Sequence, residues 1–230
     1  MGFVPDYFGS NDYTMGVAPY GRLRLWNSHR YIRLNANDLS VNLLDQRTWQ
    51  LGPLLSYRMG RNDVDDDVVE RMRKIDNSVE AGLTGSWSWI DPRYAQHRFN
   101  LSVDFLHDVS SEHEGFVVNT MARYWRPVSR RLVYSLGLGT TFASDNLNST
   151  FFGVNATDSA ASRLPGFTAE GGIRDIRVPP AVVWSMSKTL HFAAGLVYGR
   201  LLGDAADSPV VDMRGSKNRF VTGEGLVRTW

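Results

Sequence analysis

The sequence predicts an all-β fold, a transmembrane antiparallel β-barrel of about ten strands that forms one domain over residues 1–230. Apolar and polar residues alternate along segments that turn residues separate, which is the pattern of strands in a barrel. No stretch approaches the roughly 18 to 20 consecutive apolar residues that a membrane-spanning helix needs. Aromatic residues gather at the ends of the alternating segments, as they do at the two surfaces of a membrane. They are Trp26, Trp49, Trp87, Trp89, Tyr124, Trp125, Trp184, Tyr198 and Trp230.

The bulk composition excludes some classes of protein. The formal net charge is +1, so no basic excess indicates a nucleic-acid partner. The chain has no cysteine, which excludes thiolate metal sites and disulfide scaffolds. A soluble β-sandwich would also alternate, but the Gly, Ser and charged residues on the polar faces suit the narrow interior of a closed barrel. The barrel is therefore the preferred interpretation.

The first three expected strands lie near residues 15–26, 31–44 and 49–59. The first two alternate irregularly. In the third, Leu55 and Tyr57 fall on one face and polar residues fall on the other. This period of two predicts a strand with one apolar face.

Four strands with regular alternation follow, near residues 79–89, 99–105, 116–125 and 132–142, and hairpins link them. In the last of these, large apolar residues alternate with Ser, Gly and Thr. We expect its large apolar side chains to face lipid, because the outside of a barrel is its apolar face. They are Leu132, Tyr134, Leu136, Leu138 and Phe142.

The C-terminal part adds the strands 176–185 and 190–198 and the stretch 219–230, which brings the count to ten. Eight or twelve strands remain alternatives, because the stretches 151–154 and 31–44 can each be counted differently. An even number of strands would place both chain ends on the same side of the membrane.

Connection lengths predict the orientation of the barrel. The links "DQR", "DPRYA", "PVSR" and "MSKT" are short, whereas those at 61–75, 107–114, 145–166 and 203–217 are long. Short periplasmic turns and longer outer loops are typical of outer-membrane barrels. We expect the last two loops, which contain Pro, Gly and short polar residues, to be ordered turns folded over the outer mouth. The start "MGFVPDYFGS" lacks the regions of a signal peptide. For an exported protein, we therefore expect a mature or re-engineered start, with Met1 standing where a signal was removed.

Several stretches next to the expected loops carry a family resemblance. They are "PDYFGSNDYTMGVAPY", "LGPLLSYRMGR", "FFGV", "SRLPGFTAEGGIRD" and "YGRLLGDAADSPVV" followed by "GSKNRF". Together they resemble the MipA/OmpV family of Gram-negative outer-membrane proteins, also called MltA-interacting proteins, over nearly the whole chain. Arg163 stands where the family usually has glycine, and the chain ends on Trp230 where the family usually ends on phenylalanine.

The resemblance implies a location in the cell outer membrane and a scaffold role rather than an enzyme activity. Such a barrel would tether the murein lytic transglycosylase MltA to a bifunctional penicillin-binding protein at the periplasmic face, where cell wall is remodelled. It also implies that the terminal Trp230 is the signal that the barrel-assembly machinery recognises. We expect a monomer surrounded by lipid. A narrow diffusion channel or a surface adhesin is the alternative function.

Charged residues on the polar faces are the candidates for the lumen of the barrel. A lumen of this width would hold side chains that pair with one another as a plug, or would leave a selective pore. The paired plug is the preferred interpretation. The lumen candidates are Arg22, Arg58, Glu80, Arg98, Asp104, Arg123, Glu170 and Arg177.

Two acidic stretches resemble chemical sites. "NDVDDDVVERMRK" begins like a calcium loop with Asp63, Asp65 and Asp67, but it has Val68 and Lys74 where glycine and glutamate are needed, so we expect a short helix instead. "HDVSSEHEG" holds residue types used by hydrolases at barrel rims, a minor alternative, although these types are also typical of solvated loops. We therefore predict no catalytic residue, no metal ion and no cofactor.

Overall fold

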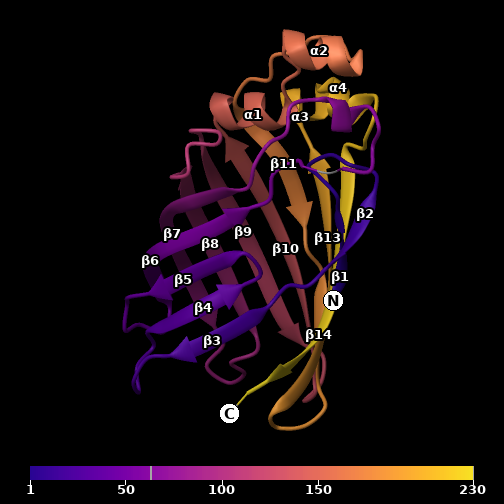
Figure 1. Cartoon of the computed structure of the whole chain (residues 1–230). Helices are drawn as coiled ribbons and strands as arrows, with labels where there is room; N and C mark the ends of the chain where they lie inside the picture. Colours follow the sequence, from indigo (N-terminus) through magenta and orange to yellow (C-terminus); the bar gives the residue numbers. More distant parts are fainter. Residues whose placement is uncertain (63, 230) are drawn as a thin grey trace.

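The computed structural model describes residues 1–62 and 64–229 of the chain. The described residues form one strongly curved antiparallel sheet of fourteen strands, with short helices gathered at one end of it (Figure 1). The all-β antiparallel fold that the alternation predicts is thereby confirmed. None of the helices among these residues has the length and apolar character needed to cross a membrane.

The strands are β1 (Gly2–Pro5), β2 (Tyr13–Gly16), β3 (Tyr20–Arg24), β4 (Tyr31–Asn35), β5 (Asp38–Asn42), β6 (Trp49–Arg58), β7 (Ser78–Ile90), β8 (Arg98–Asp108), β9 (Phe116–Pro127), β10 (Leu132–Ala143), β11 (Gly172–Val178), β12 (Ala181–Ser185), β13 (Leu190–Leu201) and β14 (Asn218–Arg228). The helices are α1 (Asp145–Phe152), α2 (Ala156–Ser162), α3 (Gly203–Asp207), α4 (Pro209–Asp212) and the 3-10 helix η1 (Val69–Arg71). We call the end of the sheet that carries these helices the helical end. The opposite end, where β7 turns into β8 and β9 into β10, is the turn end (Figure 1).

The strands pair in one continuous order that runs from β2 to β3. This order is β2-β1-β14-β13-β11-β10-β9-β8-β7-β6-β5-β4-β3, and β12 continues β11 between β10 and β13. From β6 to β10 each strand pairs with the next one along the chain. The β1 strand pairs with β14, so the beginning and the end of the chain lie in one part of the sheet.

The expected count of ten strands is wrong, and each difference has a local cause. An additional strand, β1, pairs with β14. The stretch 15–26 forms β2 and β3, which the segment Val17 to Pro19 separates. The stretch 31–44 is a hairpin of β4 and β5, because the chain reverses at Ala36, whose φ is 52°. Prolines at 179 and 180 lack the N–H groups that a strand needs, and they divide 176–185 into β11 and β12.

The stretch 151–154, which could have been counted as a strand, contains the end of helix α1. The two long loops expected to contain ordered turns, 145–166 and 203–217, instead contain the helices α1 to α4. The short helix expected near residues 63–74 is present as η1.

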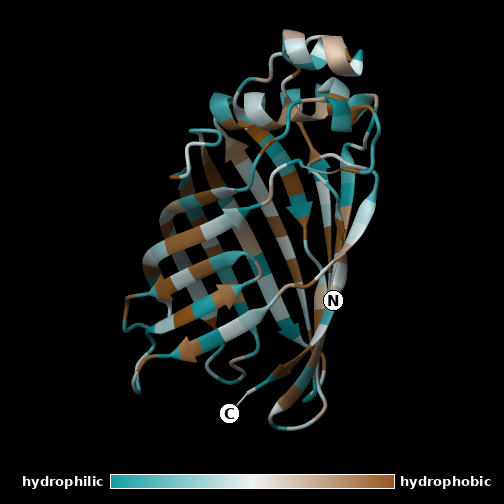
Figure 2. Cartoon of the chain, viewed as in Figure 1, coloured by the Kyte–Doolittle hydropathy of each residue, from teal (hydrophilic) through white to brown (hydrophobic). Residues whose placement is uncertain are grey.

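Hydrophobic and hydrophilic residues alternate along many of the strands (Figure 2). On β10, Ser135 and Thr141 are buried, whereas Leu136 and Leu138 are 50% and 59% exposed on the outer face. The apolar face of this strand therefore points outward and its small polar face points into the curved sheet. The same outward apolar face occurs on the neighbouring strands, where the exposed residues include Leu51, Leu55, Leu83, Leu101, Val103, Phe105, Ile176, Val182 and Trp184.

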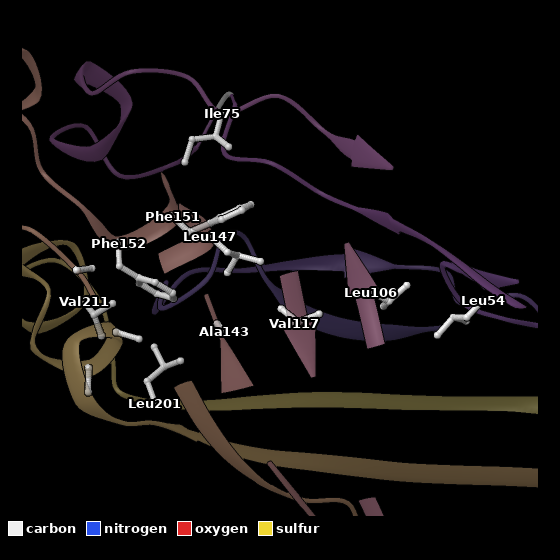
Figure 3. Packing of buried hydrophobic residues seen from close by; sticks show 13 residues of the cluster. Leu54, Ile75, Leu106, Val117, Ala143, Leu147, Phe151, Phe152, Leu201 and Val211 are labelled. Carbon is white, nitrogen blue, oxygen red and sulfur yellow. The ribbon is translucent and has the colours of Figure 1, made fainter. Parts of the chain in front are cut away.

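The hydrophobic core lies at the helical end rather than along the whole sheet (Figure 3). Helix α1 supplies Leu147, Phe151 and Phe152, which pack with Val117 of β9 and Leu201 of β13. Phe152 and Leu147 are completely buried. Truncating a buried phenylalanine typically costs about 3–5 kcal/mol, so this packing holds the helices firmly against the strands.

Candidate functional site

Charge is distributed unevenly between the two ends of the sheet. The connections at the helical end (6–12, 59–77, 109–115, 144–171 and 202–217) hold sixteen acidic and seven basic residues. The connections at the turn end (25–30, 43–48, 91–97, 128–131 and 186–189) hold two acidic residues, at 45 and 91, and six basic ones. The turn end is thus net basic and the helical end strongly acidic, although the net charge of the whole chain is only +1. Such a separation attracts partners of opposite charge to each end.

A groove lies at the turn end between two turns that the pairing of β8 with β9 brings together. Its volume is about 500 Å³. The β7–β8 turn and the β9–β10 turn line it, and we call it the turn-end groove. The lining residues are Tyr94, Gln96, His97, Arg126, Pro127, Val128, Ser129 and Arg130.

The β7–β8 side of the groove is held by Asp91. Its Oδ1 accepts the backbone N–H of Arg93 at 2.8 Å, and its Oδ2 lies 3.0 Å from Nδ1 of His97. The other ring nitrogen of His97, Nε2, lies 2.7 Å from the hydroxyl of Tyr124 on β9. The N–H of Arg93, followed by His97, lowers the pKa of Asp91 below its usual value, so the carboxylate stays charged and keeps the turn ordered.

The β9–β10 side of the groove is a tight turn with an exposed apolar tip. The Oγ of Ser129 accepts the backbone N–H groups of Arg131 and Leu132 at 3.2 and 3.1 Å, which fixes the turn. Val128 is 61% exposed at its tip, and Tyr94 across the groove is 65% exposed. Exposed apolar and aromatic side chains beside arginines are the composition of protein interfaces.

Two of the predicted lumen residues, Arg58 and Glu80, form a buried pair between β6 and β7. The Nε of Arg58 donates to Oε1 of Glu80 at 2.7 Å and its Nη2 donates to Oε2 at 2.9 Å. His113 of the β8–β9 loop lies beside them, with Nε2 3.2 Å from the same Oε1, and its Nδ1 accepts the N–H of Gly115. The side chains of Glu80 and His113 are completely buried. At these positions the charges pair with one another.

Other predicted charges lie against aromatic rings. The Cζ atoms of Arg98 and Arg123 lie 4.7 and 5.7 Å from the ring centroid of Trp125. Arg22 lies 3.9 Å above the ring of Tyr31. Aromatic rings attract a cation through their negative faces, which holds these arginines in place. None of the three forms an ion pair with a carboxylate of residues 1–62 or 64–229.

Two of the remaining predicted residues, Arg177 and Asp104, lie near each other. The Nη2 of Arg177 donates to Oδ1 of Asn119 at 3.3 Å, and Asp104 lies opposite Asn119 in the β8–β9 ladder. The prediction that Glu170 faces the lumen is wrong. Glu170 is exposed and lies before β11 begins, and its backbone N–H donates to Oδ2 of Asp204 at 2.7 Å. Trp230, the expected assembly signal, lies outside the described residues.

The structure also brings together interior residues that the sequence analysis did not identify: Phe8, Arg174, Asp175 and Arg219. Arg174 and Asp175 are neighbours in the chain, so strict alternation would put them on opposite faces. The signal that could have found them is "IRDIR", in which the two isoleucines, both on the outer face, are three positions apart. That spacing requires one extra residue in the strand.

The two acidic stretches contribute to loop structure. In "HDVSSEHEG", the Oδ2 of Asp108 accepts the N–H groups of His113 and Glu114, and its Oδ1 accepts the hydroxyl of Ser110 at 2.6 Å. In "NDVDDDVVERMRK", Asp63 lies outside the described residues, and Asp66 caps η1 and pairs with a distant arginine at 214. Within the described part of the chain, no three His, Cys, Asp or Glu residues cluster as ligands for a metal ion.

Comparison with protein families gives one match over the complete chain. The model of the family described as MltA-interacting protein MipA matches residues 1–230. Among curated proteins, none matches the sequence. Because the family model covers every residue, the chain belongs to the MipA family of MltA-interacting proteins.

Proposed function

We propose that the protein is a monomeric outer-membrane β-barrel that acts as a scaffold for enzymes of cell-wall remodelling. The membership of the MipA family supports this role, since the family is described by its interaction with MltA. In this proposal the partners are a murein lytic transglycosylase and, through it, a penicillin-binding protein. The chain itself catalyses no reaction.

The outer face of the strands supports a location in lipid. Large apolar residues such as Leu136, Leu138 and Trp184 are about half exposed on it. Monomeric soluble proteins rarely expose apolar patches larger than a few hundred Å², because water solvates such surfaces poorly. A bilayer core accepts this face at no such cost, and curved antiparallel strands satisfy their backbone groups by pairing with their neighbours.

The lengths of the connections support an orientation with the turn end in the periplasm. The turns at this end are short, and the helical end carries the long connections, as in outer-membrane barrels generally. The helical end would then face outward and close the outer mouth.

The observation that carries the scaffold proposal is the turn-end groove. It combines exposed apolar side chains with Arg126 and Arg130, in a region where basic residues exceed acidic ones. A periplasmic enzyme with an acidic surface loop would bury its apolar contacts there and would be drawn to the arginines. We propose that the lytic transglycosylase docks at this groove.

A binding experiment with charge reversal tests the proposal. The full-length protein, folded in detergent, is used to capture a purified lytic transglycosylase. We expect Arg126→Glu together with Arg130→Glu to weaken capture at least about tenfold, which corresponds to about 1.4 kcal/mol. A matched control at the helical end, Arg71→Glu with Arg163→Glu, changes the net charge equally and should leave capture intact. Equal loss in both variants, or no loss in either, would contradict docking at the groove.

A further inference from the structure

Four arginines from three strands converge inside the sheet, below the helical end. Arg58 comes from β6, Arg174 and Arg177 from β11, and Arg219 from β14. The Cζ atoms of three of them surround the ring of Phe8, at 5.8 Å for Arg58, 4.7 Å for Arg174 and 5.2 Å for Arg219. We call these four arginines the arginine cage.

A β-bulge creates the cage. Thr141 of β10 pairs with Asp175, but the next residue, Phe142, pairs with Ile173, so Arg174 is an extra residue in β11. A bulge re-aims side chains, and both Arg174 and Asp175 become buried as a result. A regular strand would have placed one of these two charges on the outer face.

The cage holds more positive than negative charge. Asp175 pairs with three of the arginines. Its Oδ2 accepts a hydrogen bond from Nε of Arg174 at 3.0 Å, and its carboxylate lies 3.1 Å from Arg177 and 3.8 Å from Arg219. Glu80 serves the fourth, Arg58. Two carboxylates therefore face four guanidinium groups.

The nearest further carboxylate does not remove this excess. Asp104 of β8 interacts electrostatically with Arg177 but also with Arg33 of β4, and a second acidic residue, Asp38, lies beside it. Arg33, Asp104 and Asp38 together carry one negative charge in excess, so the cage and this neighbouring set are left with about one unmatched positive charge.

Two buried donors in the cage, Nη1 of Arg174 and Nε of Arg177, make no hydrogen bond to any described residue, although Nε of Arg177 lies 3.1 Å from Oδ1 of Asp175. The side chain of Arg174 is 5% exposed. Buried charges and donors normally have partners, because removing them from water without compensation costs several kcal/mol. The orphaned Nη1 and the excess charge both favour an anion with several acceptor oxygens.

We infer that the arginine cage binds a small phosphate-type oxyanion, with Phe8 and the helical end above it. Inorganic phosphate, which carries about one to two negative charges near neutral pH, matches the unmatched positive charge. The planar guanidinium groups suit its oxygens, because arginine binds oxyanions through paired N–H donors. The inference goes beyond the scaffold function and does not depend on it.

Calorimetric titration of the folded full-length protein with inorganic phosphate, at constant ionic strength set by sodium chloride, tests the cage. We expect saturable binding that raises the temperature of unfolding. A second titration with glycerol 3-phosphate distinguishes free phosphate from a lipid headgroup as the ligand. A site for the free anion should bind inorganic phosphate more tightly, and a site for a headgroup should bind the phosphate ester more tightly. Stabilisation that grows linearly without saturation, as excluded salts cause, would overturn the inference.

Substitutions locate the site. Arg174→Gln should weaken phosphate binding at least about tenfold, the loss expected for a hydrogen bond to a charged group. The matched control Arg98→Gln removes an arginine that lies on Trp125, outside the cage, and should bind as the wild type does. If Arg174→Gln does not fold, Arg219→Lys is the substitute variant. It keeps the positive charge but removes the paired N–H donors of the guanidinium group, so it should also weaken phosphate binding. Equal weakening by Arg98→Gln would contradict the assignment to the cage.

Discussion

Arg58 and Glu80 face each other on the neighbouring strands β6 and β7, joined by two hydrogen bonds of 2.7 and 2.9 Å. The Glu80 side chain is completely buried and that of Arg58 is 12% exposed. Replacing one partner leaves a buried charge without compensation, which typically costs about 3–5 kcal/mol. We therefore expect Glu80→Gln to lower the free energy of unfolding by an amount near the low end of this range, measured by urea unfolding of the detergent-folded protein.

The double variant Arg58→Met with Glu80→Gln serves as the control for this pair. It removes the unpaired charge along with the interaction, so it should be more stable than Glu80→Gln alone. A double variant less stable than the single one would show that the charge of Arg58 is matched elsewhere in the interior.

Tyr7, in the connection between β1 and β2, should resist ionisation. It is 5% exposed, and burial, with a smaller contribution from the charge of Asp66, raises the pKa of Tyr7 to about 12. The folded state favours the neutral phenol, so its stabilising contribution is complete below the ordinary pKa of 10.0 and is lost as the pH rises toward 12. The free energy of unfolding of the wild type should therefore fall across this range relative to that of Tyr7→Phe.

Ultraviolet absorbance of tyrosinate checks this prediction at about pH 11. The folded wild type and folded Tyr7→Phe should have the same tyrosinate signal, because Tyr7 is still protonated. After unfolding in denaturant, the wild type should exceed the variant by one tyrosinate. A difference that is already present between the folded proteins would contradict the raised pKa.

Helix α2 should depend on its capping box. The side chain of Asn155 accepts the N–H of Asp158 at 2.8 Å, and the side chain of Asp158 accepts the N–H of Asn155 at 3.4 Å. Asn155→Ala removes half of this box and should cost about 0.5–2 kcal/mol. Hydrogen exchange of the α2 amides should accelerate accordingly, whereas the exposed helix residue Thr157 changed to alanine should have little effect.

The same hydrogen-exchange experiment tests whether helices α1 to α4 form a stable cover at the helical end. Helices α1 to α4 pack on the strands through buried residues, so the segments 145–166 and 203–217 should be protected in the wild type. Rapid exchange throughout both segments would show that they do not form a stable cover.

Conductance in planar bilayers distinguishes the scaffold from a narrow channel. In the proposed barrel, the paired charges and the core at the helical end would obstruct the interior, so we expect little steady current from the wild type. A steady current that changes with charge reversal at Arg58 or Arg123 would instead support a diffusion channel. Removal of the aromatic ring by Phe8→Ala should raise the current only if the cage forms the obstruction.

The sequence was sufficient to predict the central strands. In β6 and β10 buried or half-buried residues alternate with exposed ones, so the alternation in the sequence directly reflects the structure. It was insufficient where strands are short or interrupted. The reversal at Ala36 has neither glycine nor proline to mark it, and the prolines that divide β11 from β12 lie inside a stretch that otherwise alternates.

The candidate sites were less predictable than the strands, because they depend on contacts between distant segments. The sequence predicts short periplasmic turns, but the groove that Tyr94, Val128 and Arg130 line could be identified only from the pairing of β8 with β9. The cage was missed because a bulge cancels the alternation at Arg174 and Asp175. The helices at 145–166 are short, and their polar residues are also typical of turns.

Single-cysteine footprinting tests the central claim, docking of a lytic transglycosylase at the turn-end groove, most directly. The chain has no native cysteine, so Val128→Cys in the groove and Met213→Cys at the helical end each give one label site. The two positions are matched, since Val128 is 61% and Met213 is 59% exposed. In membrane-embedded protein, we expect the purified enzyme to slow maleimide labelling of Val128→Cys severalfold and to leave Met213→Cys unchanged. Protection of Met213→Cys, or unchanged labelling at both positions under conditions where the enzyme is bound, would contradict the account.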